Sequence, residues 1–202
     1  AGLKKKPDTS DPSKPTEEKI TVTFRLVGAS ESTSGSIDME KGVYDSEYQN
    51  WVKTTTYAMD KNSTVYDLYV ESMSDAGLSS VGAKDNYVKT ITAPAGYGGY
   101  DLSEFTNGKF SGWMYTVNGT HPNVGLQACR LRDNDEVVWH YVNDYRYEVE
   151  DWHGGSRGDE STWNLWLKAD DVNPPKGNGS DGSGGGSKGD GNGKNEVVTE
   201  LK

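Results

Sequence analysis

The sequence predicts an α+β domain in which a small, mostly antiparallel β-sheet packs against one helix. Several short segments alternate apolar and polar residues, a pattern typical of strands with one buried face. A single segment carries apolar residues at helical spacing. The later strands are joined by short connections, which favour antiparallel neighbours.

The first half of the predicted domain holds two strands and the helix. Residues 20–26 alternate between apolar side chains and threonine or arginine, and residues 51–59 are rich in β-branched residues. Asn62 or Ser63 is predicted to cap the helix, because a short side-chain oxygen accepts a backbone N–H that the first turn leaves unpaired. Gly77 is predicted to end it. The apolar stripe of this helix comprises Val65, Leu68, Tyr69, Met73 and Ala76.

The segment after the helix begins with a short predicted strand over 87–92 and a glycine-rich loop with two tyrosines over 94–100. A hairpin is predicted over 111–119, because aromatic and apolar residues alternate there. Its last two residues, Asn118 and Gly119, both accept positive φ and therefore predict a tight turn.

The second half ends with three further predicted strands. A brief strand is expected over 126–132, an acidic turn over 133–135, and an alternating strand over 136–142. A last strand is predicted around 163–167, where tryptophan and leucine alternate.

The run from Gly112 to Val142 resembles a bacterial surface domain of unknown function that is related to the C-terminal domain of transcobalamin and intrinsic factor. The pattern of that family is a Gly-Trp-x-Tyr-x-Val-Asn-Gly hairpin, an Asn-Val-Gly segment, and an acidic turn before Val-x-Trp-x-Tyr. The matching residues are Gly112, Trp113, Tyr115, Val117, Asn118, Gly119, Asn123, Val124, Gly125, Asp133, Asp135, Val137, Trp139 and Tyr141. The sequence departs from the pattern at Asn134, which replaces a turn glycine, and at Cys129, where an aromatic residue is common.

The resemblance covers roughly residues 19–145 and implies a transcobalamin C-terminal-like, β-grasp-like fold. Members of the family look like extracellular modules of Gram-positive bacteria, and in the vertebrate relatives the equivalent domain helps to enclose cobalamin. Because kinship of fold does not transfer function, cobalamin enters here only as one candidate ligand.

Three regions of the chain are expected. Residues 1–18 contain three prolines and one isolated leucine, which predicts a flexible leader. Residues 19–170 form the predicted domain, with a tryptophan-rich extension from about residue 146 that either covers the sheet or binds a partner. Residues 171–202 are rich in glycine, serine and aspartate and predict a flexible linker.

Composition excludes several classes of function. The 202 residues include 21 Lys and Arg against 31 Asp and Glu, so the formal net charge is −10, which disfavours binding to nucleic acid or anionic lipid. No segment approaches the ~18 apolar residues of a membrane span. A single cysteine, Cys129, cannot form an internal disulfide and is too little for a cysteine zinc site.

The candidate binding residues are aromatic side chains, which can hold a planar or sugar-like ligand by stacking, with one amide from the family motif. These candidates are Tyr97, Tyr100, Trp113, Tyr115, Asn123, Trp139 and Tyr141. The alternation of Trp113, Tyr115 and Trp139 also fits the core face of a sheet. Tyr97 and Tyr100 lie on a loop, where aromatic residues are more often contact residues.

No metal site and no catalytic residue is predicted. The acidic segments lack the spacing of a calcium-binding loop, and nothing supports a glycosidase pair of carboxylates. The histidines lack the spacing of a helical zinc site, and His140 is expected at the surface, on the strand face opposite Trp139. Cys129 is expected to be an inert, half-buried thiol.

The expected function is that of a non-catalytic, extracellular binding or adhesion module on a bacterial cell-surface protein. Its ligand is expected to be a corrinoid such as cobalamin, a glycan or a surface protein, and no cofactor is expected. The alternative is a structural spacer or protein–protein assembly domain. An enzyme would need perturbed carboxylates or a nucleophile–base pair in a cleft, and the sequence offers neither.

Overall fold

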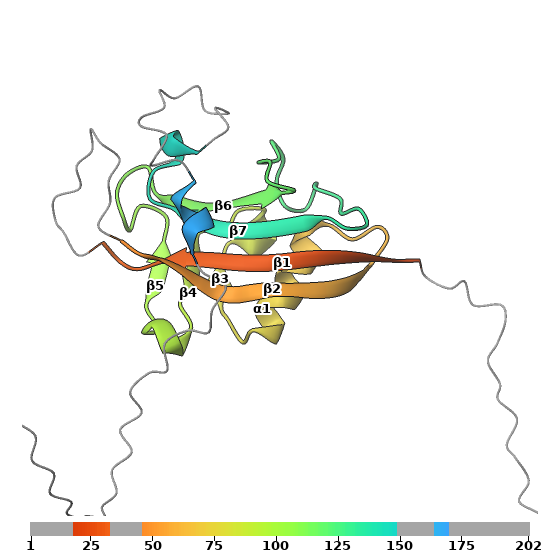
Figure 1. The fold of residues 1–202 in the computed structure, drawn as a ribbon, viewed down its shortest axis with the longest axis horizontal. Coiled ribbons are helices and arrows are strands. Elements are labelled where there is room, and N and C mark those ends of the chain that lie inside the picture. Colours follow the sequence, from red (N-terminus) through yellow and green to blue (C-terminus); the bar gives the residue numbers. More distant parts are fainter. Residues whose placement is uncertain (1–17, 33–45, 149–163, 170–202) are drawn as a thin grey trace, which may run out of the picture.

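The computed structural model describes residues 18–32, 46–148 and 164–169 (Figure 1). The predicted leader apart from Glu18, the predicted linker and most of the predicted tryptophan-rich extension fall outside these residues. Strands are β1 (Lys19–Ala29), β2 (Tyr48–Asp60), β3 (Ser80–Val81), β4 (Thr90–Thr92), β5 (Asp101–Ser103), β6 (Gly112–Val117) and β7 (Glu136–Val142). One α-helix, α1 (Val65–Asp75), lies among the described residues, with short 3-10 turns η1 (Ala83–Asp85), η2 (Ala95–Tyr97), η3 (Tyr145–Tyr147) and η5 (Leu165–Lys168).

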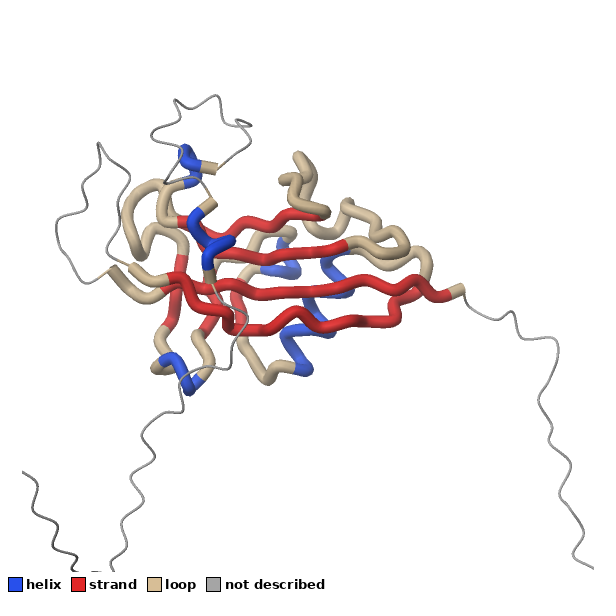
Figure 2. The backbone as a smooth tube through the Cα atoms, in the orientation of Figure 1, coloured by secondary structure: helices blue, strands red, loops and turns tan. Residues whose placement is uncertain are grey.

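The larger sheet has the order β2-β1-β7-β6 (Figure 2). Its two central strands, β1 and β7, run parallel, whereas β2 and β6 each pair antiparallel with a neighbour at the edge. A second, antiparallel sheet has the order β3-β4-β5. This small mixed domain with mostly antiparallel pairs and one helix confirms the predicted α+β class, and the β-grasp-like description fits it.

The larger sheet is covered on both faces, as Figure 1 shows for α1 behind it and η5 in front. Phe24 and Leu26 belong to the main core, which α1 joins through residues such as Tyr69. Val27, one position further along β1, belongs to a second core with Trp166 of η5. Both faces of β1 are therefore apolar in its second half, because successive side chains of a strand point to opposite faces.

The helix begins one or two residues later than the predicted caps. Thr64 is the N-cap: its Oγ1 accepts a hydrogen bond from the Asp67 N–H at 3.3 Å, and Asp67 Oδ2 accepts one from the Thr64 N–H at 2.7 Å. This capping box satisfies two backbone donors reciprocally. Thr64 also forms an isolated bridge with Arg130, which holds it extended and places the start of the helix there. Gly77 follows the helix at φ 64°, as predicted for its end.

The predicted strand over 126–132 is wrong. Its backbone makes a turn, in which the Ala128 and Cys129 N–H groups donate to the Gly125 carbonyl. The carbonyls of Cys129 and Leu126 accept hydrogen bonds from Val65 and Tyr66, at the first turn of α1. Because the first N–H groups of a helix lack partners within it, this segment serves the helix and not the sheet.

Two other predicted strands are shorter or absent. The strand expected over 87–92 is reduced to β4, and the segment expected as a last strand forms η5 over its described part. The predicted tight turn is confirmed, since Asn118 and Gly119 take φ values of 53° and 77°. No helix among the described residues is long and apolar enough to cross a membrane.

Candidate functional site

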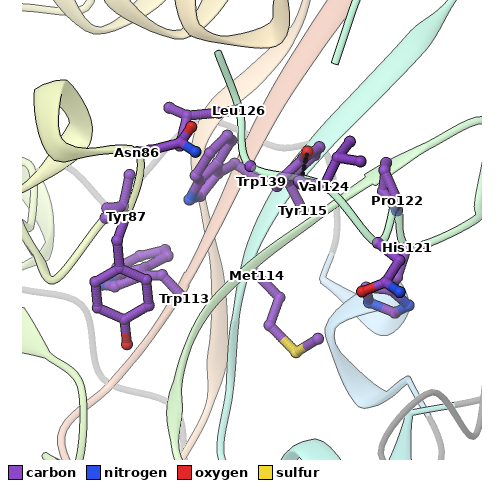
Figure 3. A pocket seen from close by; sticks show the side chains of 13 residues that line it. Asn86, Tyr87, Trp113, Met114, Tyr115, His121, Pro122, Val124, Leu126 and Trp139 are labelled. Carbon is purple, nitrogen blue, oxygen red and sulfur yellow. Dashed lines mark hydrogen bonds between the residues drawn. The ribbon is translucent and has the colours of Figure 1, made fainter. Parts of the chain in front are cut away.

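A pocket of about 330 Å³ lies at the β6 edge of the larger sheet. Trp113 and Tyr115 line it from one face of β6, and Met114 lines it from the other face. Figure 3 shows Tyr87 at one end of the pocket and Pro122 and His121 at the other. The lining residues are Asn86, Tyr87, Val88, Trp113, Met114, Tyr115, His121, Pro122, Asn123, Val124, Gly125, Leu126 and Trp139.

The loop over residues 121–126 forms one wall of the pocket. The Tyr115 hydroxyl donates to the Val124 carbonyl at 2.7 Å and so ties this loop to β6. At Gly125, a Cβ would lie closer than 3.0 Å to the side chain of Asn86. Asn86 cannot easily move, because its Oδ1 accepts a hydrogen bond from the Gln127 N–H at 2.9 Å. Glycine is therefore required where the loop meets the opposite wall.

Aromatic rings form the floor of the pocket. Tyr115 stacks on Trp139 with 4.9 Å between centroids and 13° between planes, and Tyr69 packs against Trp139 at 4.5 Å. Trp139 is only 2% exposed, whereas Tyr115 is half-buried. Burial raises the pKa of Tyr115, so its phenol stays protonated at neutral pH and acts as a hydrogen-bond donor.

The structure brings four of the seven predicted binding residues to this pocket: Trp113, Tyr115, Asn123 and Trp139. Tyr141 is instead fully buried in the core, where its hydroxyl donates to the Ser103 carbonyl at 2.8 Å. Its place there follows from the alternation of β7, which aims it at the same face as Trp139.

The two loop tyrosines lie outside the pocket lining and are half-buried, not fully exposed. Tyr100 donates to the Ala29 carbonyl at 2.6 Å, and Tyr97 donates to the Asn50 carbonyl at 3.2 Å. Both hydroxyls therefore fasten the 94–100 loop to β1 and β2. Burial raises the pKa of Tyr100 to about 12.

Several pocket residues were missed by the sequence analysis. Tyr87 is 51% exposed, and its hydroxyl donates to Glu104 Oε2 at 2.6 Å. Val124 is 50% exposed on the opposite wall. Both had a local signal, because Tyr87 begins the strand predicted over 87–92 and Val124 belongs to the Asn-Val-Gly motif. Asn86 carried none, since its place in the wall depends on the fold alone.

A second cluster of polar side chains lies next to the pocket and consists of His121, His140 and Glu148. The prediction that His140 lies at the surface is wrong: it is 0% exposed, because Trp166 of the C-terminal segment stacks on its ring at 3.9 Å. Burial lowers the pKa of His140. Burial raises the pKa of Glu148, but its hydrogen-bond partners outweigh this effect and lower it to about 2.

Cys129 is partly buried beside the pocket, and burial raises the pKa of its thiol. A raised pKa reduces the fraction of thiolate, which is the nucleophilic form. The expectation of an inert thiol therefore has a physical basis in the structure.

In a comparison with protein families, residues 58–143 match one family model, which is described as "Domain of unknown function (DUF4430)". No curated protein matches the chain. The matched residues run from the end of β2 to just beyond β7 and contain all the residues that line the pocket. The chain thus carries, over residues 58–143, a domain similar to that family.

Proposed function

We propose that this domain is a non-catalytic ligand-binding module of an extracellular bacterial surface protein, and that its pocket holds one ring of the ligand. The observation that carries the proposal is the aromatic pocket at the β6 edge. Its volume of about 330 Å³ falls at the lower end of the range of about 300–1,000 Å³ for small-molecule sites. Its walls are mostly apolar and aromatic, with a few polar groups to orient a ligand.

The pocket geometry favours a sugar ring or a comparably small ring over a whole corrinoid. Tyr115 has one face against Trp139, and we assign its opposite face to the ligand as the stacking surface. We assign the exposed amide of Asn123 and the hydroxyl of Tyr87, two residues that line the pocket, as polar contacts to such a ring. A corrinoid is a macrocycle with a nucleotide arm, so a pocket of this size would hold only part of it.

The resemblance to the C-terminal domain of transcobalamin supports a ligand-enclosing role and the extracellular location. The resemblance identifies no contact residue beyond those that line the pocket. Cobalamin is therefore tested as one probe among several. Labelling of intact source cells by an antibody against this domain tests the location, and labelling seen only after lysis contradicts it.

Binding is tested with the full chain, a panel of methyl glycosides and cyanocobalamin as probes, and isothermal titration calorimetry. Replacing Tyr87→Ala removes an exposed aromatic wall and is expected to weaken binding of the responding probe by about 2- to 12-fold, the free-energy range of an aromatic contact. The matched control is Phe105→Ala, which removes an aromatic side chain that is 61% exposed and does not line the pocket.

Two results would contradict the proposal. One is the absence of binding by every probe at millimolar concentration, which would favour the spacer or assembly role. The other is equal loss of affinity in Tyr87→Ala and Phe105→Ala, which would place the binding site elsewhere on the domain.

A further inference from the structure

The cluster of His121, His140 and Glu148 joins three segments that are separate in the sequence. His121 directly follows the hairpin turn of β6, His140 lies on β7, and Glu148 ends η3. Their side chains are 5%, 0% and 4% exposed. Among the residues that the structure describes, this is the group of histidine and acidic side chains whose donor atoms converge, all within 4.8 Å of one another.

The three donor atoms form a nearly equilateral triangle. His121 Nε2 lies 3.4 Å from His140 Nε2 and 3.4 Å from Glu148 Oε2, and His140 Nε2 lies 3.6 Å from the same oxygen. These separations are longer than the usual distance of about 2.7–3.2 Å between the donor and acceptor atoms of a direct hydrogen bond. Donor atoms around a tetrahedral zinc ion, with bonds of about 2.0–2.2 Å, lie about 3.3–3.6 Å apart. The triangle therefore has the dimensions of one face of a zinc coordination tetrahedron.

One of the two neutral tautomers of His140 aims a lone pair into this triangle. Its Nδ1 lies 3.3 Å from the Val138 carbonyl, which accepts a hydrogen bond when Nδ1 carries the proton. In that tautomer, the Nε2 lone pair faces the Glu148 carboxylate oxygen, which is also an acceptor. Two acceptors this close repel each other unless a cation lies between them. A histidine that donates its other ring N–H to a backbone carbonyl is the usual arrangement of a metal ligand.

Trp166 holds two members of the cluster, Glu148 and His140, in place. Its Nε1–H donates to Glu148 Oε2 at 3.0 Å, and its indole stacks on the His140 ring with 15° between planes. The carboxylate thereby keeps one hydrogen bond from an outer residue while its remaining lone pairs are available to a cation. Such outer contacts fix the orientation of metal ligands.

We propose that His121 Nε2, His140 Nε2 and Glu148 bind a divalent transition-metal ion, of which Zn²⁺ is the best fit, with a fourth position left for water or another ligand. Two imidazoles and one carboxylate suit zinc, whereas calcium and magnesium prefer oxygen ligands alone. The bound ion connects β7, the loop after β6 and the end of η3. The metal site does not require the proposed pocket ligand, and either one can exist without the other.

The test uses the full chain, freed of metal with a chelator and then titrated with ZnCl₂ by isothermal titration calorimetry. We expect one ion per chain, and no comparable binding of CaCl₂ or MgCl₂. Thermal unfolding should shift upward with added ZnCl₂, because a ligand that binds only the folded state stabilises it. Titration with CoCl₂ should give the visible absorption of four-coordinate cobalt with nitrogen ligands.

The variant Glu148→Gln keeps the shape of the side chain and removes its charge, and it is expected to weaken Zn²⁺ binding by about tenfold or more. The matched control is Glu71→Gln, an exposed carboxylate on α1, which should bind Zn²⁺ as the unchanged chain does. If Glu148→Gln does not fold, Trp166→Phe keeps an aromatic ring on His140 but loses the donor to Glu148. Its Zn²⁺ affinity is expected to fall by about 10- to 100-fold.

The proposal is overturned if the unchanged chain binds Zn²⁺ no better than Mg²⁺, or if the cobalt complex shows six-coordinate absorption only. It is also overturned if a folded Glu148→Gln binds Zn²⁺ like the control. None of these results affects the sugar-ring proposal, which is measured with uncharged probes in the absence of metal.

Discussion

Gly28 of β1 packs directly against the indole of Trp51 on β2. An added Cβ at this position would lie closer than 3.0 Å to three atoms of the Trp51 indole. Trp51 is 6% exposed and is held by Trp113 at 5.5 Å, by Tyr100 at 6.0 Å, and by a hydrogen bond from its Nε1 to Gln49. The substitution Gly28→Ala must therefore displace a ring that is packed on several sides.

Two opposing contributions set the size of this effect. Forcing an extra methyl group into a packed core costs about 1–3 kcal/mol. Replacing glycine with alanine otherwise stabilises a protein by about 0.4–1 kcal/mol, because the unfolded chain loses freedom. Gly28→Ala is therefore expected to lower the free energy of unfolding by about 1–2 kcal/mol, measured by urea unfolding followed by tryptophan fluorescence.

Gly112 of β6 provides a matched control, because it is also a strand glycine without positive φ. A Cβ there would meet one atom within 4 Å, Glu104 Cβ at 3.9 Å, which is ordinary contact. Gly112→Ala is expected to leave stability unchanged or to raise it by up to about 1 kcal/mol. Equal effects of the two substitutions would refute the argument that the Trp51 indole occupies the space beside Gly28.

Three further predictions concern stability. Thr64→Ala removes the capping box and should lower the free energy of unfolding by about 1 kcal/mol in the same urea assay, whereas no change would show that the Thr64–Arg130 bridge alone fixes the helix start. Asn107→Ala deletes hydrogen bonds from a fully buried amide to the Ser30 carbonyl and to Asn143 Oδ1, and should cost about 2–4 kcal/mol; a loss below 1 kcal/mol would mean that water replaces the amide. Because the pKa of Tyr100 is raised to about 12 in the folded chain, its contribution to stability should be complete below pH about 10 and decline as the pH approaches 12, so Tyr100→Phe should reduce the alkaline loss of stability.

The parts of the fold that the sequence predicted are those that local patterns determine. The alternation in 20–26 and 136–142 identified β1 and β7, and Asn118-Gly119 identified the turn after β6. In each case the periodicity or the turn chemistry is contained within a few neighbouring residues. The resemblance supplied the β-grasp-like arrangement, which no local pattern determines.

The errors arose where distant segments supply the partners. Residues 126–132 alternate like a strand, but their carbonyls accept hydrogen bonds from the start of α1. His140 was expected in solvent because the sequence does not show that Trp166 covers that face of β7. The cluster of His121, His140 and Glu148 has no motif spacing for the same reason, since its three members come from the loop after β6, from β7 and from the end of η3.

The pocket and the proposed metal site share one residue, His121, and this gives the two proposals a common consequence. The pocket wall over 121–126 is held at Val124 by the Tyr115 hydroxyl and at Gly125 by close contact with Asn86. His121 is another anchor, and a bound ion would restrict its side chain further. Restricting a binding loop before the ligand arrives lowers the entropic cost of binding.

A ring probe that binds the pocket should therefore bind more tightly when ZnCl₂ is present, and the probe should raise Zn²⁺ affinity by the same factor, because coupling between two sites is reciprocal. The measurement is a calorimetric titration of the probe at zero and at saturating ZnCl₂, repeated with Glu148→Gln, in which the difference should disappear. Equal probe affinities in the unchanged chain would show that Tyr115 and Asn86 already fix the loop and that His121 adds nothing to it.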